Sequence, residues 1–378
     1  MSDINMPLYQ QIYNYVIDEI KTGKFRSGDR IPSEKELAEE FKVSRITSKK
    51  ALEMLMENGF ITRMPGRGSY VMEDAGKKAN SIPEISQYVK KTGTMIGVII
   101  PDFSESYGMT LLSGIERKAS EENCFVVMKR SFGHQDMEEE VIDSLLELGV
   151  DGIIVMPVHG EHYNPKILRL ILDGFPVVSV DRCLSGIPVP FVGTDNLNVS
   201  KKATDYLLGL GHTNIAVLSP PIRNTSAIED RVEGFVKSHA ENGVVVDESI
   251  WLTNLVSTLP GKNTKENIEA DINRIMEFLN NKPEITCLYA VEYNIALLAM
   301  KAAKALGKKV PEDISIFCFD SPFNYVGEYL FTFVRQREAE MGATAVELLL
   351  KQMKEKGVND KVYLDADLVI GATTVKKK

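Results

Sequence analysis

The sequence is poor in cysteine and has no long apolar run. Its four cysteines, at positions 124, 183, 287 and 318, form no CxxC pair and no metal-ligand spacing. We therefore expect reduced thiols that are buried as small hydrophobic residues, without disulfides or zinc. No apolar run approaches the ~20 residues of a membrane-spanning helix, and the start, MSDINMPLYQQIYNYV, has neither the basic nor the apolar segment of a signal peptide. These absences predict a cytoplasmic protein with no membrane partner.

Motifs of several enzyme and cofactor classes are also missing. There is no GxxxxGK[ST] phosphate loop, and Gly66-Arg67-Gly68 lacks the strand-to-helix setting of a dinucleotide-binding loop. No Ser, Cys or Lys stands in a nucleophile motif. His159 and His162 have no third metal ligand nearby, so we interpret them as surface residues. We expect no catalytic residue, no metal and no cofactor.

The 378 residues, 44% of them hydrophobic, are enough for two or three domains with proper cores. The net charge of −9 argues against a nucleic-acid partner only if the charge is spread evenly. Residues 1–74 contain eleven Lys/Arg and twelve Asp/Glu, so they carry −1 and the remaining residues carry −8. No acid occurs from Lys42 to Lys50. The local charge therefore permits DNA binding, and the near-neutral balance predicts that tight binding needs two such domains on one DNA site.

Residues 31–71 have the pattern of a winged helix-turn-helix. Ser33 and Glu36 have the spacing of a capping box, which predicts that a helix starts there. Ser44 then caps a second helix, and Gly59 ends it. Its predicted buried stripe is Ala51, Leu52, Leu55 and Met56. Two strands, over residues 60–63 and 69–71, flank the turn at residues 65–68.

The second helix of this motif has a basic, exposed face. Arg45 and Lys49 lie four residues apart with Thr47 beside them, which suits phosphate and base-edge contacts in a major groove. The tip of the hairpin, with Arg67, is narrow enough to meet the minor groove or its phosphates. Each feature alone is common, but all of them in this order predict binding to double-stranded DNA.

The stretch from Pro7 to Val71 resembles the GntR family of bacterial transcription factors, in PLYQQI, GDRIPSEKELAEEF, VSRITSKKAL, LMENGFI and PGRGSYV. The resemblance implies a winged helix-turn-helix domain. It assigns DNA contacts to Lys35, Ser44, Arg45, Thr47, Lys49 and Gly66, and the basic tip adds Arg67. Ser48 and Lys49 stand where Val and Arg are frequent in the family. Because Lys is a flexible point charge and Arg a bidentate donor, we expect a different base preference at Lys49.

A helix over residues 8–22 precedes this motif, and a linker over residues 74–93 follows it. The helix has an apolar stripe at i, i+3, i+4 spacing: Tyr9, Ile12, Tyr13, Val16, Ile17 and Ile20. The linker loses periodicity and gains charged and small residues, although a short helix over residues 84–90 fits its sequence. We therefore divide the chain into a DNA-binding domain at 1–73, a linker at 74–93, and an effector-binding and dimerisation domain at 94–378.

After Thr94 short apolar runs alternate with amphipathic helices, which predicts parallel α/β sheets covered on both faces. The predicted strands are 95–100, 124–128, 152–156, 176–180, 214–218, 286–290 and 314–319, and the clearest helices are 106–121, 135–148, 198–210 and 294–305. Such a length exceeds one comfortable core, so we expect two doubly wound lobes. Ligands of such folds bind at the carboxyl ends of the strands. This rule selects Asp102-Phe103, Pro157, Asp181-Arg182 and Asp320.

This part of the chain is similar to the effector-binding domain of the LacI/GalR family, which is related to periplasmic sugar-binding proteins. The landmarks are IGVIIPDF, GVDGIIVMP, PVVSVDR, VGTDN, YLLGLGHTNIAVLSPP, DRVEGF, VPEDISIFCFD and VRQREAEMG, in this order. A GntR-type reader joined to a LacI-type sensor resembles the AraR type of sugar-responsive repressor, whose effector is arabinose. The resemblance implies a homodimer on a two-fold symmetric operator.

The resemblance also assigns effector contacts to Asp102, Phe103, Asp181, Arg182, Arg231, Asp320 and Gln336. Carboxylates and guanidinium groups take pairs of sugar hydroxyls, and an aromatic ring covers an apolar ring face. Two alternatives remain for single residues: Asp181 and Asp320 as loop-capping carboxylates, and Arg231, at a predicted helix start, as a surface ion pair. Two departures, Glu292-Tyr293 for the usual Asn-Asp and Ser321 after Asp320, leave open which monosaccharide or short oligosaccharide binds.

Two other functional classes compete with a sugar-controlled repressor. One is an enzyme fused to the winged helix, such as the pyridoxal-phosphate-dependent, aminotransferase-like members of the GntR family. It requires a cofactor lysine, and none is identifiable. The other is a transport binding protein, which the first domain and the missing signal peptide oppose.

Overall fold

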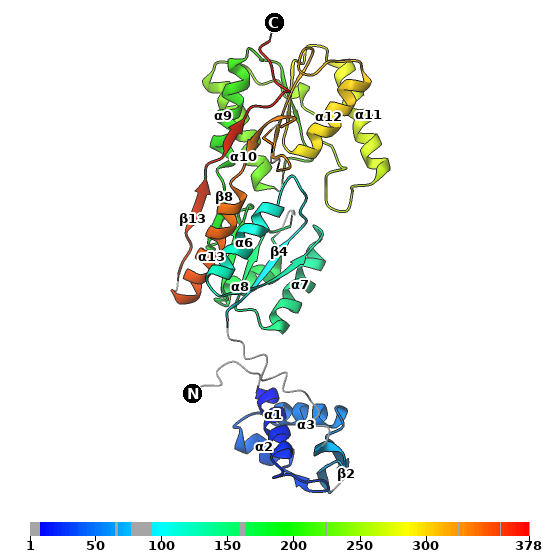
Figure 1. Cartoon of the computed structure of the whole chain (residues 1–378), viewed down its shortest axis with the longest axis vertical. Coiled ribbons are helices and arrows are strands. Elements are labelled where there is room, and N and C mark those ends of the chain that lie inside the picture. The colour runs from blue at the N-terminus through cyan, green and yellow to red at the C-terminus, as the bar shows by residue number, and fades with distance from the viewer. Residues whose placement is uncertain are drawn as a thin grey trace. The chain divides into compact units, whose positions relative to one another are not determined.

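The computed structural model of the chain describes residues 8–64, 67–76, 93–158, 163–223, 225–323, 326–327, 329–355 and 357–377 (Figure 1). Its contacts divide the chain into two units, Met1–Thr92 and Gly93–Lys378. The predicted short helix at 84–90, and His159 and His162, lie outside the described residues. Among the residues described, no helix is both long and apolar enough to cross a membrane.

The first unit is a winged helix-turn-helix. Its helices are α1 (Leu8–Lys21), α2 (Glu34–Glu40) and α3 (Arg45–Glu57), and its strands are β1 (Arg30–Ile31), β2 (Ile61–Met64) and β3 (Gly68–Val71). The strands form an antiparallel sheet in the order β1-β3-β2. The apolar stripe of α1 packs against Leu37 of α2 and the buried side of α3.

The predicted buried stripe of α3 is wrong at one residue. Ala51, Leu52 and Leu55 are buried, but Met56 is 41% exposed. At 3.6 residues per turn, Met56 lies roughly 90° around the helix from the centre of the stripe. The stripe is instead extended by Ser48, which is fully buried.

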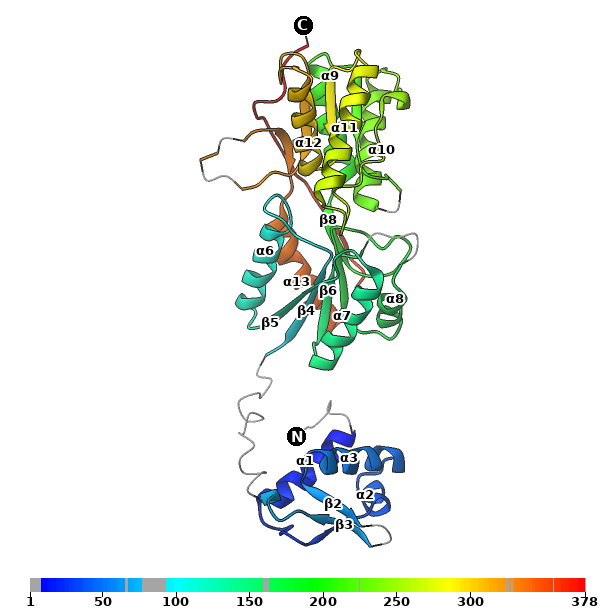
Figure 2. The ribbon, with the colours of Figure 1, turned by 90° about the vertical axis from the view of Figure 1, so that its right-hand side faces the viewer.

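The second unit has two lobes (Figure 2). The first contains a parallel sheet in the order β13-β8-β7-β6-β4-β5. The strands are β4 (Met95–Ile100), β5 (Phe125–Arg130), β6 (Gly152–Val155), β7 (Val177–Val180), β8 (Phe191–Thr194) and β13 (Lys361–Leu364). The covering helices are α6 (Met109–Glu121) and α13 (Glu338–Lys354) on one face, and α7 (Gln135–Leu148) and α8 (Pro165–Leu172) on the other.

The sheet of the second lobe has the order β14-β12-β11-β10-β9, with β14 antiparallel to β12. The strands are β9 (Ile215–Leu218), β10 (Cys287–Ala290), β11 (Ser315–Phe319), β12 (Thr332–Arg335) and β14 (Asp367–Val369). The helices are α9 (Asn196–Gly209), α10 (Ser226–Glu241), α11 (Lys265–Asn281), α12 (Tyr293–Ala305) and the short η1 (Glu248–Ile250). The helices α9 and α10 pack together, as do α11 and α12 (Figure 1).

The chain passes between the lobes along β8 to α9, β12 to α13, and β13 to β14. The backbone around Thr194, Gln336 and Ala366 is therefore shared by both lobes. Any change in the angle between the lobes has to be accommodated at these crossings.

The predicted two-lobed α/β architecture is confirmed, and each predicted strand is present. The strands β8, β12, β13 and β14 were missed, and α10 begins five residues before Arg231, so the predicted helix start there is wrong. The prediction of four buried cysteines is also wrong: Cys287 and Cys318 are buried, whereas Cys124 and Cys183 are partly exposed.

Candidate functional site

Two helix caps fix the ends of α2 and α3 in the first unit. The Ser33 amide donates to Glu36 Oε2 at 2.7 Å and the Glu36 amide donates to Ser33 Oγ at 3.3 Å, which completes the predicted capping box. The Thr47 amide donates to Ser44 Oγ at 3.2 Å, and the two hydroxyls lie 2.9 Å apart. These bonds satisfy backbone donors that a helix start leaves unpaired. They set where α3 begins.

Two further contacts join α3 and the hairpin to α2. The buried Ser48 hydroxyl donates to the Glu34 carbonyl at 2.8 Å, and Arg63 of β2 pairs with the Glu34 carboxylate at 2.6 Å. A polar residue at position 48 is thus explained by a hydrogen bond between helices. Both contacts hold the orientation of α3 relative to the hairpin.

The predicted DNA-contacting residues lie on α2, at the start of α3 and at the hairpin. Arg45 and Arg67 are exposed. Lys49 and Lys35 lie 3.7 and 3.8 Å from Glu53 and Glu39 in exposed ion pairs, which contribute little and exchange readily. Ser44 and Thr47 bond to each other, so their first role is to cap α3. Gly66 lies outside the described residues.

The second unit contains a cavity of about 450 Å³ between its lobes. All seven residues predicted to contact an effector line it: Asp102, Phe103, Asp181, Arg182, Arg231, Asp320 and Gln336. They come from the carboxyl ends of strands in both sheets, from α10 and from the crossing after β12. Lining by both lobes means that a bound molecule contacts the two lobes at once.

Asp181 and Asp320 occupy equivalent positions, directly after β7 and β11. Both have a left-handed backbone, with φ of 65° and 64°, a conformation that costs free energy for a residue other than glycine. Tyr107 donates its hydroxyl to Asp181 at 2.6 Å, and Gln336 donates to Asp320 at 2.9 Å. Among the described residues, these carboxylates accept from side chains and not from their own loops. Burial raises the pKa of Asp320 to about 6, against the opposing charge of Arg231.

The two guanidinium groups are fixed by hydrogen bonds to backbone carbonyls and, for Arg231, also to a side-chain amide oxygen. Arg231 donates from Nε to Asn196 Oδ1 at 2.8 Å and from Nη1 to the Val291 carbonyl at 2.7 Å, and it lies 4.0 Å over the Phe319 ring. Arg182 donates to the Pro157 carbonyl at 2.9 Å. These contacts show that Arg231 is no surface residue, since it is only 6% exposed. Each guanidinium is oriented before any ligand arrives.

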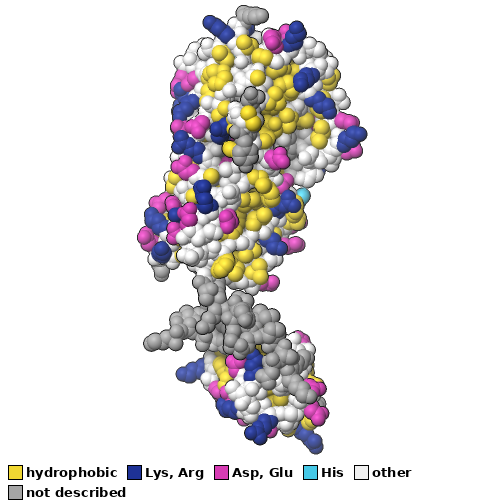
Figure 3. All heavy atoms as spheres, in the orientation of Figure 1, with side chains coloured by type: hydrophobic (Ala, Val, Ile, Leu, Met, Phe, Trp, Pro, Cys, Tyr) yellow, Lys and Arg dark blue, Asp and Glu magenta, His cyan; other side chains and the backbone are white. Residues whose placement is uncertain are grey.

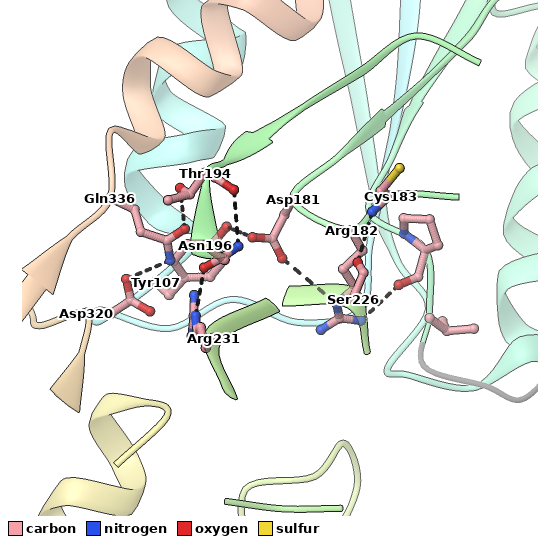
Figure 4. Close-up of polar contacts among 12 residues, drawn as sticks. Tyr107, Asp181, Arg182, Cys183, Thr194, Asn196, Ser226, Arg231, Asp320 and Gln336 are labelled. Carbon is pink, nitrogen blue, oxygen red and sulfur yellow. Dashed lines mark hydrogen bonds and ion pairs between the residues drawn. The ribbon is translucent and has the colours of Figure 1, made fainter. Parts of the chain in front are cut away.

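Gln336 joins the pocket to the crossings between the lobes. Its Oε1 accepts from the Thr194 hydroxyl at 2.6 Å, while its Nε2 donates to Asp320 (Figure 4). Thr194 and Gln336 stand on two different crossings, so a ligand that contacts Asp320 acts on the segments that set the angle between the lobes. One chain of hydrogen bonds therefore connects the cavity to both crossings.

The lobes also touch outside the crossings. The Cys183 amide, after β7, donates to Ser226 Oγ at the start of α10, at 3.1 Å. At the other side of the cavity, Gly133 packs on Pro260: a Cβ added at Gly133 would lie only 2.2 Å from the Pro260 Cβ. These contacts join the two lobes beside the cavity.

Several residues of the cavity were missed by the sequence reasoning. Tyr107 lies in a loop, and Ser257 and Thr258 belong to a segment without regular structure. Glu292 follows β10 at its carboxyl end, so the strand-end rule points to it as directly as to Asp320. It was interpreted only as a departure from the family pattern. In the described part of the chain no cluster of His, Cys, Asp and Glu could hold a metal ion.

Comparisons with known proteins agree with this architecture. Residues 8–71 match the model of bacterial regulatory proteins of the gntR family, and residues 93–325 match that of periplasmic binding proteins and sugar binding domain of LacI family. An enzymatic second domain is therefore not supported.

Similar proteins include transcriptional repressors. An arabinose metabolism transcriptional repressor of Geobacillus stearothermophilus is 26% identical over 367 residues, which cover 95% of this chain and 94% of that protein. A ribose operon repressor of Halalkalibacterium halodurans is 29% identical over 286 residues, covering 75% and 80%. The crystal structure of a LacI family transcriptional regulator from Enterococcus faecium with bound ribose has a TM-score of 0.62 at 24% identity, over 75% of this chain and all of that one. This structure supports the fold of the second unit.

Proposed function

The chain belongs to the family of periplasmic binding proteins and sugar binding domains of LacI type and carries a gntR-family domain at its amino-terminal end, and on this premise we propose that it is a sugar-controlled transcriptional repressor of carbohydrate-utilisation genes. It binds operator DNA through the first unit and a sugar in the cavity of the second. It acts in the cytoplasm, without a cofactor, and the proposal assigns it no catalytic activity.

One observation carries the proposal: the cavity joins both lobes and presents paired carboxylates and guanidinium groups. Sugars are recognised by such groups, because each hydroxyl both donates and accepts a hydrogen bond. Phe103 and Tyr293 also line the cavity and offer rings for the apolar face of a sugar. The effector contacts proposed are those that resemblance assigns: Asp102, Phe103, Asp181, Arg182, Arg231, Asp320 and Gln336.

The DNA contacts proposed are Lys35, Ser44, Arg45, Thr47, Lys49, Gly66 and Arg67. Arg45 and Lys49 meet base edges in the major groove, while Arg67 meets the backbone or the minor groove. A sugar that binds only between closed lobes shifts the population towards closure. Through the crossings this changes the spacing of two reading heads, and affinity for the operator falls.

Two reading heads require a homodimer, which we propose forms through the second unit. Figure 3 shows hydrophobic side chains gathered on one face of both lobes. Exposed apolar residues of the first lobe include Met109 on α6 and Phe125 and Met128 on β5, at 51%, 59% and 38% exposure. The edge strand β5 carries two of them. Exposed apolar surface of this kind favours association.

Binding of the purified protein to DNA from its own promoter region, at fixed salt, tests the proposed function. Fluorescence anisotropy is measured with and without each member of a panel of monosaccharides and short oligosaccharides. One sugar is expected to weaken DNA binding, by roughly 5- to 150-fold for an ordinary allosteric coupling. Binding that no sugar alters would overturn the assignment of the second unit as a sugar sensor.

A further inference from the structure

Three buried polar atoms lie together on the second-lobe side of the cavity. They are Glu292 Oε1, Ser257 Oγ and Thr258 Oγ1, and among the described residues none of these atoms makes a hydrogen bond of normal geometry, although the Thr258 hydroxyl lies close enough to Glu292 to act as a donor to its carboxylate. Buried polar atoms in proteins are nearly always paired, and leaving one unpaired costs about 1–3 kcal/mol. We call these three residues the Glu292 corner.

The loop that carries two members of the corner is held by a buried carboxylate. Asp271 of α11 is fully buried, and its Oδ2 accepts from the amides of Val256 and Ser257 at 2.9 and 2.7 Å. Arg274 pairs with its other oxygen at 2.7 Å. The hydroxyls of Ser257 and Thr258 are therefore positioned by the fold and not by a flexible surface loop.

Glu292 stands at the start of α12 but does not cap the helix with its side chain. Burial raises the pKa of its carboxyl, while Thr258, Arg231 and Arg182 lower it. Burial is the largest of these effects, so the pKa of the carboxyl lies above its ordinary value, and Thr258 and the two guanidinium groups only limit the rise. Hydrogen-bond donors beside the carboxylate reduce the cost of burying its charge. Because a carboxylate has no hydrogen of its own, it needs such donors from whatever occupies the cavity.

Among the described residues that line the cavity, each guanidinium group has a carboxylate beside it. Arg182 Nε lies 3.9 Å from Asp181 Oδ2, and the positive charge of Arg231 lowers the pKa of Asp320. Asp102 is paired with Arg130 at 3.0 Å. Glu292 is then a further negative charge, and a phosphate or carboxylate beside it would meet like-charge repulsion in a partly buried site.

We propose that the Glu292 corner determines effector specificity: it accepts hydroxyl donors of an uncharged sugar and rejects sugar phosphates and sugar acids. This inference rests on the proposed function, because it names the class of effector for the same cavity. The side-chain hydroxyls of Ser257 and Thr258 bind the same sugar hydroxyls as the Glu292 carboxylate does. Unlike the carboxylate, they act both as donors and as acceptors.

Calorimetry with the full chain tests this inference, using matched sets of sugars. One set is D-glucose, D-glucose 6-phosphate, D-glucuronate and D-glucosamine, and others are built in the same way on D-ribose, L-arabinose and D-galactose. The uncharged member of one set is expected to bind at least ten times more tightly than its phosphate and its acid. Glu292→Gln keeps the shape but removes the charge, so affinity for the uncharged sugar should fall about 10- to 150-fold.

The same variant should also lose selectivity, which a merely structural role would not change. The affinity for the uncharged sugar divided by the affinity for its acid should be at least ten times smaller in Glu292→Gln than in the unmodified protein. Thr258→Val, which removes only a hydroxyl, should weaken the uncharged sugar about fivefold. Glu266→Gln, an exposed change on α11, is the matched control and should alter neither quantity.

Preference of the unmodified protein for a phosphate, an acid or an amine would overturn the inference while leaving a sugar-controlled repressor in place. So would an unchanged affinity ratio in Glu292→Gln. If no sugar of any set binds, the proposed function itself fails. The two failures are therefore distinguishable.

Discussion

The contact of Gly133 with Pro260 allows a direct test of whether lobe closure is needed for effector binding. Gly133 has φ of +74°, and an alanine Cβ there would lie 2.2 and 2.4 Å from Cβ and Cγ of Pro260. Carbon atoms in contact prefer about 3.5–4.0 Å. Gly133→Ala therefore forces the two loops apart.

Gly149 provides the matched control. Its φ of +79° is nearly the same, so alanine has the same backbone cost of about 1 kcal/mol, but the new Cβ would meet no described atom within 4 Å. Both variants should lose similar stability. Only Gly133→Ala should also destabilise the closed lobes, by about 1–3 kcal/mol as for other overpacked contacts.

A penalty of this size should weaken sugar binding by about 5- to 150-fold in Gly133→Ala relative to Gly149→Ala. Calorimetry measures the sugar affinity, and thermal unfolding without sugar measures stability. In the double variant Gly133→Ala, Pro260→Gly the clash is removed, so most of the affinity should return. Equal sugar affinities in the two alanine variants would refute the idea that closure across this contact accompanies binding.

Three further changes test single parts of the account. Arg45→Ala or Lys49→Ala should reduce discrimination between operator and unrelated DNA by about 1–3 kcal/mol, as measured by anisotropy at fixed salt, with sugar binding unchanged; undiminished discrimination in both variants would contradict their assignment. Arg231→Lys should remove the sugar response but not DNA binding, because Lys cannot replace the bonds to Asn196 and Val291; normal release by sugar would disprove its role. Because the pKa of Asp320 is about 6 and the carboxylate is a much stronger acceptor of hydroxyls than the protonated carboxyl, sugar affinity should fall roughly tenfold from pH 7.5 to pH 5, and Asp320→Asn should lack this dependence.

Local signals predicted the architecture well. The caps at Ser33 and Ser44 depend on residues three apart in the sequence, and the structure contains both. Apolar runs predicted most of the central strands because these are buried on both faces. The internal strands β8 and β12 were missed because Gly193-Thr194 and Arg335 cut their apolar runs short. The edge strands β13 and β14 were missed since they are half-exposed and have no continuous apolar run.

The cavity was predictable only where its residues follow strands. Asp181 and Asp320 stand at carboxyl ends of strands, and the sequence marks both. Ser257 and Thr258 lie in an irregular segment that is positioned by Asp271, a contact that no local pattern reveals. The packing of Gly133 on Pro260 joins residues more than a hundred positions apart, and it depends on how the lobes close.

The central claim is that sugar and operator bind to one molecule with opposite effects on each other. Operator affinity should be measured with and without saturating sugar, and sugar affinity with and without saturating operator, at the same salt and temperature. Since coupling between two binding sites is reciprocal, the account predicts that both affinities fall by the same factor. Sugar binding that is tight, and equally tight whether or not operator is bound, would contradict it.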